Sequence, residues 1–245
     1  MPRMPRKKSE SGYFHVVNKG TGSVILFVER ADYIRYLHLL KQYAEKFNIS
    51  LHAYCLMDNH THLLVCDKFD NLTTFMRKLD SAYAAYYNYK YQRTGHVFLD
   101  RFKSKPIENE EYLLTAFHYI LNNPGKANLC RAADYEWSSY HKYGLKRSFV
   151  DTGIFCELLG DWDDYEAYLA TEQNEGYFEY DSVKRDDAWA LEVIRETFGV
   201  VSGTEIASWP QEKRNAALRL LREKGLSIRQ IERLTRITRG VIQRA

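Results

Sequence analysis

The sequence predicts an α+β fold, in which helices pack on an antiparallel sheet, followed by an all-α C-terminal domain. Strand-like and helical patterns follow one another in the order strand, helix, hairpin, helix and returning strand. The stretch 31–47 repeats its apolar residues at helical spacing, which suits a helix packed on a sheet. Residues 211–245 are predicted to form short helices separated by turns.

The first half of the α+β region divides into five elements. Residues 13–18 form a first strand, and residues 23–28 form a second strand or continue the first one after a glycine turn. Residues 31–47 form a helix. Residues 51–57 and 60–66 are then two strands that join across a tight two-residue connection, which predicts a β-hairpin.

A tyrosine-rich helix is predicted next, with Asp70 or Asn71 as its cap. Ordinary helix packing accounts for most of its tyrosines. Residues 96–106 follow as an irregular stretch. A further helix begins near Glu108 and ends at Asn123, because a proline follows immediately and restricts the residue before it.

Length and composition indicate a soluble chain with one large domain or two ordinary ones. The 245 residues are 27% charged, the mean hydropathy is −0.50, and no apolar run approaches the ~20 residues of a membrane span. The basic N-terminus has no apolar segment behind it, so we expect no secretory signal. The four cysteines lack the C-x-x-C spacing of a zinc site, and we expect a cytoplasmic protein.

The net charge of +3 is unevenly distributed along the chain. Residues 211–245 carry ten Lys or Arg against three Glu, whereas residues 157–187 carry eleven Asp or Glu against two basic residues. Such a basic segment is typical of a surface that binds a polyanion, with a solvated charged helix as the alternative. We divide the chain into a disordered basic arm (1–12), a first domain (13–143), an acidic connector (144–187) and a helical domain (188–245).

Two histidines, His60 and His62, carry the first chemical signal. Residues two apart on a strand point to the same face of a sheet, so both imidazoles are expected to project side by side. Two neutral imidazoles that converge on one point form half of a site for a divalent metal. Taken alone, the pair is better interpreted as one surface histidine and one histidine packed in the core.

A second chemical group lies on the predicted helix 108–123. Tyr119 lies off the apolar stripe of this helix, and Asn123 follows one turn later on the face of Tyr119. A phenol and an amide above a metal-binding strand suit attack on a phosphodiester, with Tyr119 as the covalent nucleophile. Because the chain has 19 tyrosines, spacing alone favours a packing or surface role for Tyr119.

Four short blocks of sequence carry a family resemblance that covers roughly residues 13–143. They are residues 57–65 around the two histidines, 95–104, 119–127 beginning at Tyr119, and 137–140. In this order they resemble the single-tyrosine HUH transposases, and among these the REP-associated tyrosine transposases and their insertion-sequence relatives. The chain departs from the family pattern at Asp58, where relatives more often have proline, and at Thr61, where they have a bulky apolar residue.

The resemblance implies a ferredoxin-like sheet with the histidines on a central strand. His60 and His62 match the pair that binds a divalent cation, Mg²⁺ or Mn²⁺, and Asn123 falls where a third, polar metal ligand sits. Tyr119 matches the nucleophile, which in this family joins the 5′ phosphate of single-stranded DNA and frees a 3′-OH. Hairpin-flanked single-stranded DNA is therefore the expected partner. Relatives include swapped dimers and monomers, so a homodimer is one of two expected states.

Basic residues near the second block are the expected DNA contacts of the first domain. Arg101, Lys103 and Lys105 are predicted to meet phosphates, while bases stack on neighbouring tyrosines. No nucleotide cofactor is expected, because the phosphotyrosine bond conserves the energy of the phosphodiester that it replaces.

The C-terminal residues have the spacing of a helix-turn-helix core. Helices are predicted over residues 187–198, 211–224, 228–234 with Ser227 as its cap, and 238–244. The apolar positions of the core are Ile228, Ile231, Leu234, Ile237, Val241 and Ile242. Arg239, Gln243 and Arg244 are expected to face the major groove of duplex DNA. A plain three-helix packing unit is the alternative.

One residue of this segment departs from the helix-turn-helix pattern. Arg236 occupies the turn position where glycine is usual. A left-handed backbone there costs a non-glycine residue roughly 1 kcal/mol.

Two functions of different classes are therefore consistent with the sequence. The first is a metal-dependent tyrosine transposase or nickase that cleaves and rejoins single-stranded DNA. The second is a non-catalytic DNA-binding or regulatory protein that keeps the HUH module only as a scaffold. The presence of His60, His62, Tyr119 and Asn123 together favours the first, since a scaffold has no need of that combination.

Overall fold

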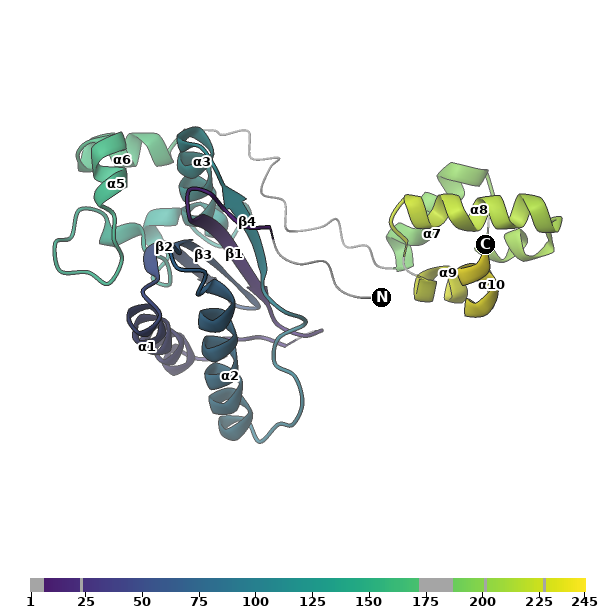
Figure 1. The fold of residues 1–245 in the computed structure, drawn as a ribbon, viewed down its shortest axis with the longest axis horizontal. Coiled ribbons are helices and arrows are strands. Elements are labelled where there is room, and N and C mark those ends of the chain that lie inside the picture. The colour runs from purple at the N-terminus through teal and green to yellow at the C-terminus, as the bar shows by residue number, and fades with distance from the viewer. Residues whose placement is uncertain (1–6, 23, 172–186, 201, 227) are drawn as a thin grey trace. The chain divides into compact units, whose positions relative to one another are not determined.

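The computed structural model describes residues 7–22, 24–171, 187–200, 202–226 and 228–245. It divides the chain into two compact units, residues 1–178 and 179–245, of which the first contains the sheet and the second is helical (Figure 1). The predicted arm over residues 1–6, the predicted connector over residues 172–186 and the predicted cap Ser227 lie outside the described residues.

The first unit is built on a four-stranded antiparallel sheet. Its strands are β1 (Tyr13–Lys19), β2 (Ser50–Met57), β3 (His60–Cys66) and β4 (Lys103–Ile107), in the order β2-β3-β1-β4. Helix α1 (Arg30–Lys46) connects β1 to β2, and helix α2 (Leu72–Lys90) connects β3 to β4. This β-α-β-β-α-β order is the ferredoxin-like topology, so the predicted α+β fold is confirmed.

Helices α1 and α2 cover one face of the sheet, as Figure 1 shows. Successive residues of a strand point to opposite faces of the sheet, so every second residue of a strand faces these two helices. In β1 and β3 the residues that face the helices include Phe14, Val16, Leu63 and Val65. Their side chains pack against the buried aromatic and aliphatic side chains of both helices. This face contains the larger core of the unit.

Helix α3 (Glu110–Leu121) covers the other face of the sheet (Figure 1). The Asn109 side chain caps α3 by accepting a hydrogen bond from the Tyr112 backbone N–H at 2.7 Å. Helices α5 (Gly153–Leu159) and α6 (Trp162–Leu169) extend this second core, where Phe117 of α3 stacks on Phe155 of α5. The described part of the predicted acidic connector thus packs into the first unit beyond residue 143.

Local elements differ from the sequence prediction in three places. The described residues of the predicted strand 23–28 form a loop, whose Leu26 and Phe27 N–H groups both donate to the Asp58 carbonyl in the hairpin turn. The stretch 96–106 was predicted to be irregular, but its last four residues belong to β4. The helix predicted to end at Asn123 ends at Leu121, and Pro124 lies at the start of a separate short helix, α4 (Asn123–Lys126).

The outer edge of β2 is covered by the segment that follows the 3-10 helix η1 (Ala132–Asp134). The Leu56 N–H donates to the Trp137 carbonyl, and the Ser139 N–H donates to the Tyr54 carbonyl, each at 2.9 Å. A second 3-10 helix, η2 (Tyr140–Lys142), follows directly. These bonds satisfy the edge of β2, which would otherwise offer a template for strand pairing.

The second unit consists of α7 (Asp187–Phe198), the 3-10 helix η3 (Gly203–Ser208), α8 (Gln211–Glu223), α9 (Ile228–Thr235) and α10 (Arg239–Arg244). Ile231, Ile237 and Ile242 are buried in its core, and Thr238 is the cap residue of α10. Arg236 has a φ of 62°, so the turn does adopt the left-handed conformation expected at this position.

Candidate active site

Strand β3 places His60 and His62 in the middle of the sheet, on the face that α3 covers. The two ring centroids are 4.9 Å apart. His62 is only 2% exposed, and its strand is flanked by β2 on one side and β1 on the other. The Nδ1 atom of His60 lies 2.7 Å from the Asn59 side-chain oxygen. The period-2 geometry of the strand thus brings both imidazoles together.

Helix α3 places Tyr119 against the ring of His62. The centroid of the Tyr119 ring lies 5.6 Å from that of His62, and the two rings meet edge to face. Asn123, one turn later at the start of α4, donates from Nδ2 to the Tyr119 carbonyl at 2.9 Å. Tyr119 and Asn123 are each 5% exposed. The structure therefore brings the Tyr119 ring next to the histidine pair, and the Asn123 side chain bonds to the backbone of Tyr119.

Two further residues, which the sequence analysis did not identify, lie at the same site. His15 of β1 stacks on His62 with ring centroids 5.3 Å apart, and its ring lies 5.6 Å from that of Tyr119. The Lys126 ammonium lies 3.9 Å from the centroid of the Tyr119 ring. The alternation of side chains along β1 does not by itself show that His15 shares a sheet face with His62. The pairing of β1 with β3 must also be known.

Burial keeps both inner imidazoles neutral. It lowers the pKa of His62 well below its ordinary value, and the nearby His15, His60 and Lys126 lower it further. Burial, aided by Lys105, lowers the pKa of His15 to about 3. A neutral imidazole has a nitrogen lone pair available, which is the form that binds a metal ion.

The donor atoms suit a hard divalent cation held by mixed nitrogen and oxygen ligands. The Nε2 atom of His62 is buried and has no hydrogen-bond partner among the residues that the structure describes. The hydrogen bond of Asn123 uses its amide nitrogen, so its amide oxygen is the atom that can coordinate. Within the described ranges, no cluster of three or more His, Cys, Asp or Glu side chains could hold a metal by itself. Asn123 is the candidate for a third, uncharged protein ligand.

Comparison with known proteins finds one family model that matches part of the chain. The family model described as "Transposase IS200 like" matches residues 8–123, a range that contains every one of the gathered side chains except Lys126. Residues 8–123 are similar to the IS200-like transposases, and we refer to the first unit as the transposase domain. No curated protein matches the chain.

A solved structure supports the fold of the transposase domain. It is described as a REP-associated tyrosine transposase bound to a REP hairpin, and its TM-score is 0.51 at 15% sequence identity. The match covers 58% of this chain and 84% of that chain. At this identity the similarity shows a shared fold.

None of the helices within the described residues has the length and apolar character needed to cross a membrane.

The three predicted DNA contacts of the transposase domain lie on two sides of its sheet. Lys103 pairs with Val17 and Lys105 with His15, so both lysines share the face of the histidines. The Lys105 ammonium lies 5.0 Å from the centroid of the Tyr112 ring.

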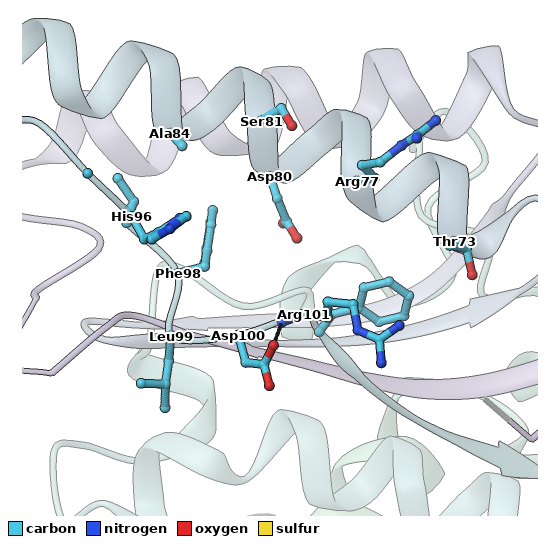
Figure 2. A pocket seen from close by; sticks show the side chains of 13 residues that line it. Thr73, Arg77, Asp80, Ser81, Ala84, His96, Phe98, Leu99, Asp100 and Arg101 are labelled. Atoms are coloured by element: carbon cyan, nitrogen blue, oxygen red, sulfur yellow. Dashed lines mark hydrogen bonds between the residues drawn. The ribbon is translucent and has the colours of Figure 1, made fainter. Parts of the chain in front are cut away.

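Arg101 instead lines a cavity of about 590 Å³ between α2 and residues 95–102. In Figure 2, Arg77 and Asp80 project from α2, and Arg101 lies on the loop opposite them. Asp80 accepts a hydrogen bond from the Asn18 side chain at 2.7 Å. Arg101 therefore does not lie on the sheet face of the candidate active site.

The predicted DNA contacts of the second unit are exposed. Arg239, Gln243 and Arg244 project from α10, where Arg239 pairs with Glu232 of α9. The Arg244 side chain donates from Nε to the Gly240 carbonyl at 2.9 Å. An arginine that already has a protein partner must exchange it when it binds a phosphate or a base.

Proposed function

We propose that the transposase domain cleaves and rejoins single-stranded DNA through a covalent bond between Tyr119 and a 5′ phosphate. The observation that carries the proposal is the contact of the Tyr119 ring with His62, a buried histidine whose Nε2 has no hydrogen-bond partner among the described residues. A nucleophile and a metal ligand that touch each other suit a reaction at phosphorus.

His60, His62 and Asn123 are the residues that would hold the divalent cation, Mg²⁺ or Mn²⁺. When bound, the cation would polarise the scissile phosphate and neutralise charge that develops on its oxygens. Three protein ligands leave further coordination positions for water and phosphate oxygens, as these hard cations require.

The protein residues then have the following roles. The Tyr119 oxygen forms a bond to phosphorus while the bond from phosphorus to the 3′ oxygen breaks; the phenol loses its proton and the 3′ oxygen gains one. Asn123 fixes the end of α3 through its bond to the Tyr119 carbonyl. The Lys126 ammonium next to the phenol ring adds positive charge where negative charge develops. Because one phosphodiester bond replaces another, joining the strands again requires no nucleotide cofactor.

The DNA strand would run along β4. Lys103 and Lys105 offer positive charge on the face of Tyr119, and Arg101 offers it beyond the start of the strand, beside the cavity under α2. The solved transposase of the same fold was bound to a REP hairpin. Hairpin-flanked single-stranded DNA is therefore the substrate class that we propose for this chain.

The second unit would bind duplex DNA as a helix-turn-helix. Its short helices α9 and α10 are joined by the left-handed turn at Arg236, and Arg239, Gln243 and Arg244 lie on the exposed side of α10. These three side chains would reach base edges or phosphates in the major groove.

Covalent capture of DNA tests the proposal. The full chain is incubated with hairpin-flanked single-stranded DNA and Mn²⁺, and denaturing electrophoresis then detects a protein–DNA adduct. We expect an adduct with the wild-type chain and with the control variant Tyr89→Phe, whose tyrosine is 89% exposed on α2. We expect none with Tyr119→Phe. No adduct with the wild-type chain, or an adduct that survives Tyr119→Phe, would favour the non-catalytic DNA-binding alternative.

A further inference from the structure

We propose that His15 is a positioning residue, which fixes the ring of His62 so that its Nε2 atom faces the metal. This inference rests on the proposed function, because it assigns a second layer of residues to the same site. The contact that carries it is a hydrogen bond of 3.0 Å between His15 Nε2 and His62 Nδ1.

The sheet itself brings the two rings together. His62 pairs with Val17 and Leu64 pairs with His15, so the two histidines are diagonal neighbours on one face of the sheet. Both side chains are buried, at 0% and 2% exposure, and their rings are stacked at an interplanar angle of 21°. Since both histidines lie on central strands, their backbones are held in place by neighbours on both sides.

The hydrogen bond between the two rings is compatible with two tautomers of His62, of which one leaves Nε2 able to bind a metal. One of the two nitrogens must donate and the other must accept. If His62 Nδ1 donates, its lone pair lies on Nε2, the buried atom without a hydrogen-bond partner among the described residues. If His15 donates instead, the proton of a neutral His62 lies on Nε2, and that atom cannot bind a metal ion. Only the first arrangement leaves Nε2 of His62 able to coordinate, so metal binding selects it.

Asn59 makes a corresponding contact with His60. The Asn59 side-chain oxygen is an acceptor and lies 2.7 Å from His60 Nδ1, so that nitrogen donates. Each histidine of the pair thus uses Nδ1 for a contact within the protein. Metal-binding histidines commonly donate their second N–H to such a partner, which orients the ring. His15 is a neutral partner, so it orients His62 without adding a negative charge to the site.

Metal binding measured without DNA or turnover tests the inference. We would titrate the full chain with Mn²⁺ and follow free Mn²⁺ by electron paramagnetic resonance. His15→Phe keeps a ring that can stack but removes the nitrogen, and we expect its Kd for Mn²⁺ to rise roughly 10- to 100-fold. His15→Gln supplies a side-chain oxygen as acceptor, and we expect it to recover part of the affinity.

His52→Phe is the matched control. His52 is also a buried strand histidine, 3% exposed, but its ring packs against Tyr13 and Phe155 and its Nδ1 bonds to the Asp151 carbonyl. We expect its Kd for Mn²⁺ to equal that of the wild-type chain. If His15→Phe also binds Mn²⁺ within twofold of wild type, the positioning role is wrong while the proposed function stands. If the wild-type chain binds no Mn²⁺, the proposed metal site fails, and the inference fails with it.

The tautomer is measured directly by ¹⁵N NMR of the imidazole nitrogens in the chain saturated with Mg²⁺, which is diamagnetic. We expect the proton of His62 on Nδ1 in the wild-type chain. In His15→Phe we expect the preference for this tautomer to weaken, a change that a loss of packing alone would not produce. A His62 ring protonated on Nε2 in the wild-type chain would overturn the inference.

Discussion

Replacing Asp32 with asparagine is predicted to destabilise the transposase domain. The Asp32 side chain is 0% exposed at the start of α1. It accepts hydrogen bonds from Val28 N, Glu29 N, Tyr86 Oη, Tyr91 Oη and Lys90 Nζ, at 2.9, 3.0, 2.9, 2.6 and 2.5 Å. One carboxylate therefore joins the N-terminus of α1 to the C-terminal half of α2.

The size of the effect follows from these contacts. Removing one partner of a buried ion pair costs about 3–5 kcal/mol, because the other charge is left without compensation. Lys90 is 23% exposed and also pairs with Glu29 at 2.5 Å, so part of its charge stays compensated. The asparagine retains one acceptor oxygen. We therefore expect Asp32→Asn to lower the free energy of unfolding by about 2–3 kcal/mol at neutral pH.

The effect should also depend on pH in a defined direction. Burial alone would raise the pKa of Asp32, but the hydrogen bonds from Lys90, Tyr91, Glu29 N–H and Tyr86 together lower it below its ordinary value of 3.8. A carboxyl with a lowered pKa in the folded state stabilises the fold fully above the unfolded-state pKa. That contribution is lost as the pH falls through the folded-state value. The difference between wild type and Asp32→Asn should therefore shrink below about pH 4.

Urea denaturation of the full chain at several pH values measures the loss of unfolding free energy in Asp32→Asn and its dependence on pH. Asp70→Asn is the matched control, since Asp70 forms an exposed pair with Lys8 and its φ of 61° is one that asparagine tolerates. We expect Asp70→Asn to leave the urea midpoint unchanged at neutral pH. An Asp32→Asn chain that unfolds at the wild-type urea concentration, or a difference that does not vary with pH, would refute the reasoning.

Three further changes have defined outcomes. Arg101→Gln should weaken binding of single-stranded DNA and reduce the slope of log K against log salt by about 0.7, because one phosphate contact is lost; an unchanged slope would place Arg101 off the DNA path. Arg236→Gly should raise the unfolding free energy of the second unit by about 0.5–1 kcal/mol, since glycine relieves the strain at a φ of 62°; a lower thermal midpoint would contradict this. Asn123→Ala should raise the Kd for Mn²⁺ at least about tenfold, and an unchanged Kd would exclude the amide as a ligand.

Local spacing predicts those parts of the candidate site that lie close together in the sequence. The two histidines share a face because strand side chains alternate, and Asn123 follows Tyr119 by one helical turn. The C-terminal core could be predicted for the same reason, because its apolar residues recur at helical spacing over a short stretch. The left-handed Arg236 followed from its place in the turn between two such helices.

Features that depend on long-range pairing could not be predicted in this way. His15 reaches His62 only because β1 pairs with β3, and nothing in the local pattern of β1 reveals that register. Residues 24–28 have strand-like composition, but their backbone bonds to the hairpin turn at Asp58 instead of to a sheet. The returning strand was predicted, but its position at β4 was not, because β4 contains Pro106, a residue that is tolerated only at a sheet edge.

The acidic composition of residues 157–171 likewise concealed a packed structure. The carboxylates of α6 point outward, while Tyr165 and Leu169 are buried against the second core. Net charge describes the exposed surface of such a helix and says little about its inner face. The first compact unit consequently extends past the boundary that charge alone suggests.

The most direct test of the account is to identify the amino acid that carries the DNA after cleavage. The covalent adduct is digested with a protease and a nuclease, and the modified peptide is sequenced by mass spectrometry. We predict one nucleotide remnant, attached through its 5′ phosphate to the oxygen of Tyr119. Attachment to any other residue, or a remnant joined through its 3′ phosphate, would contradict the assignment of Tyr119 beside His62 as the reacting group.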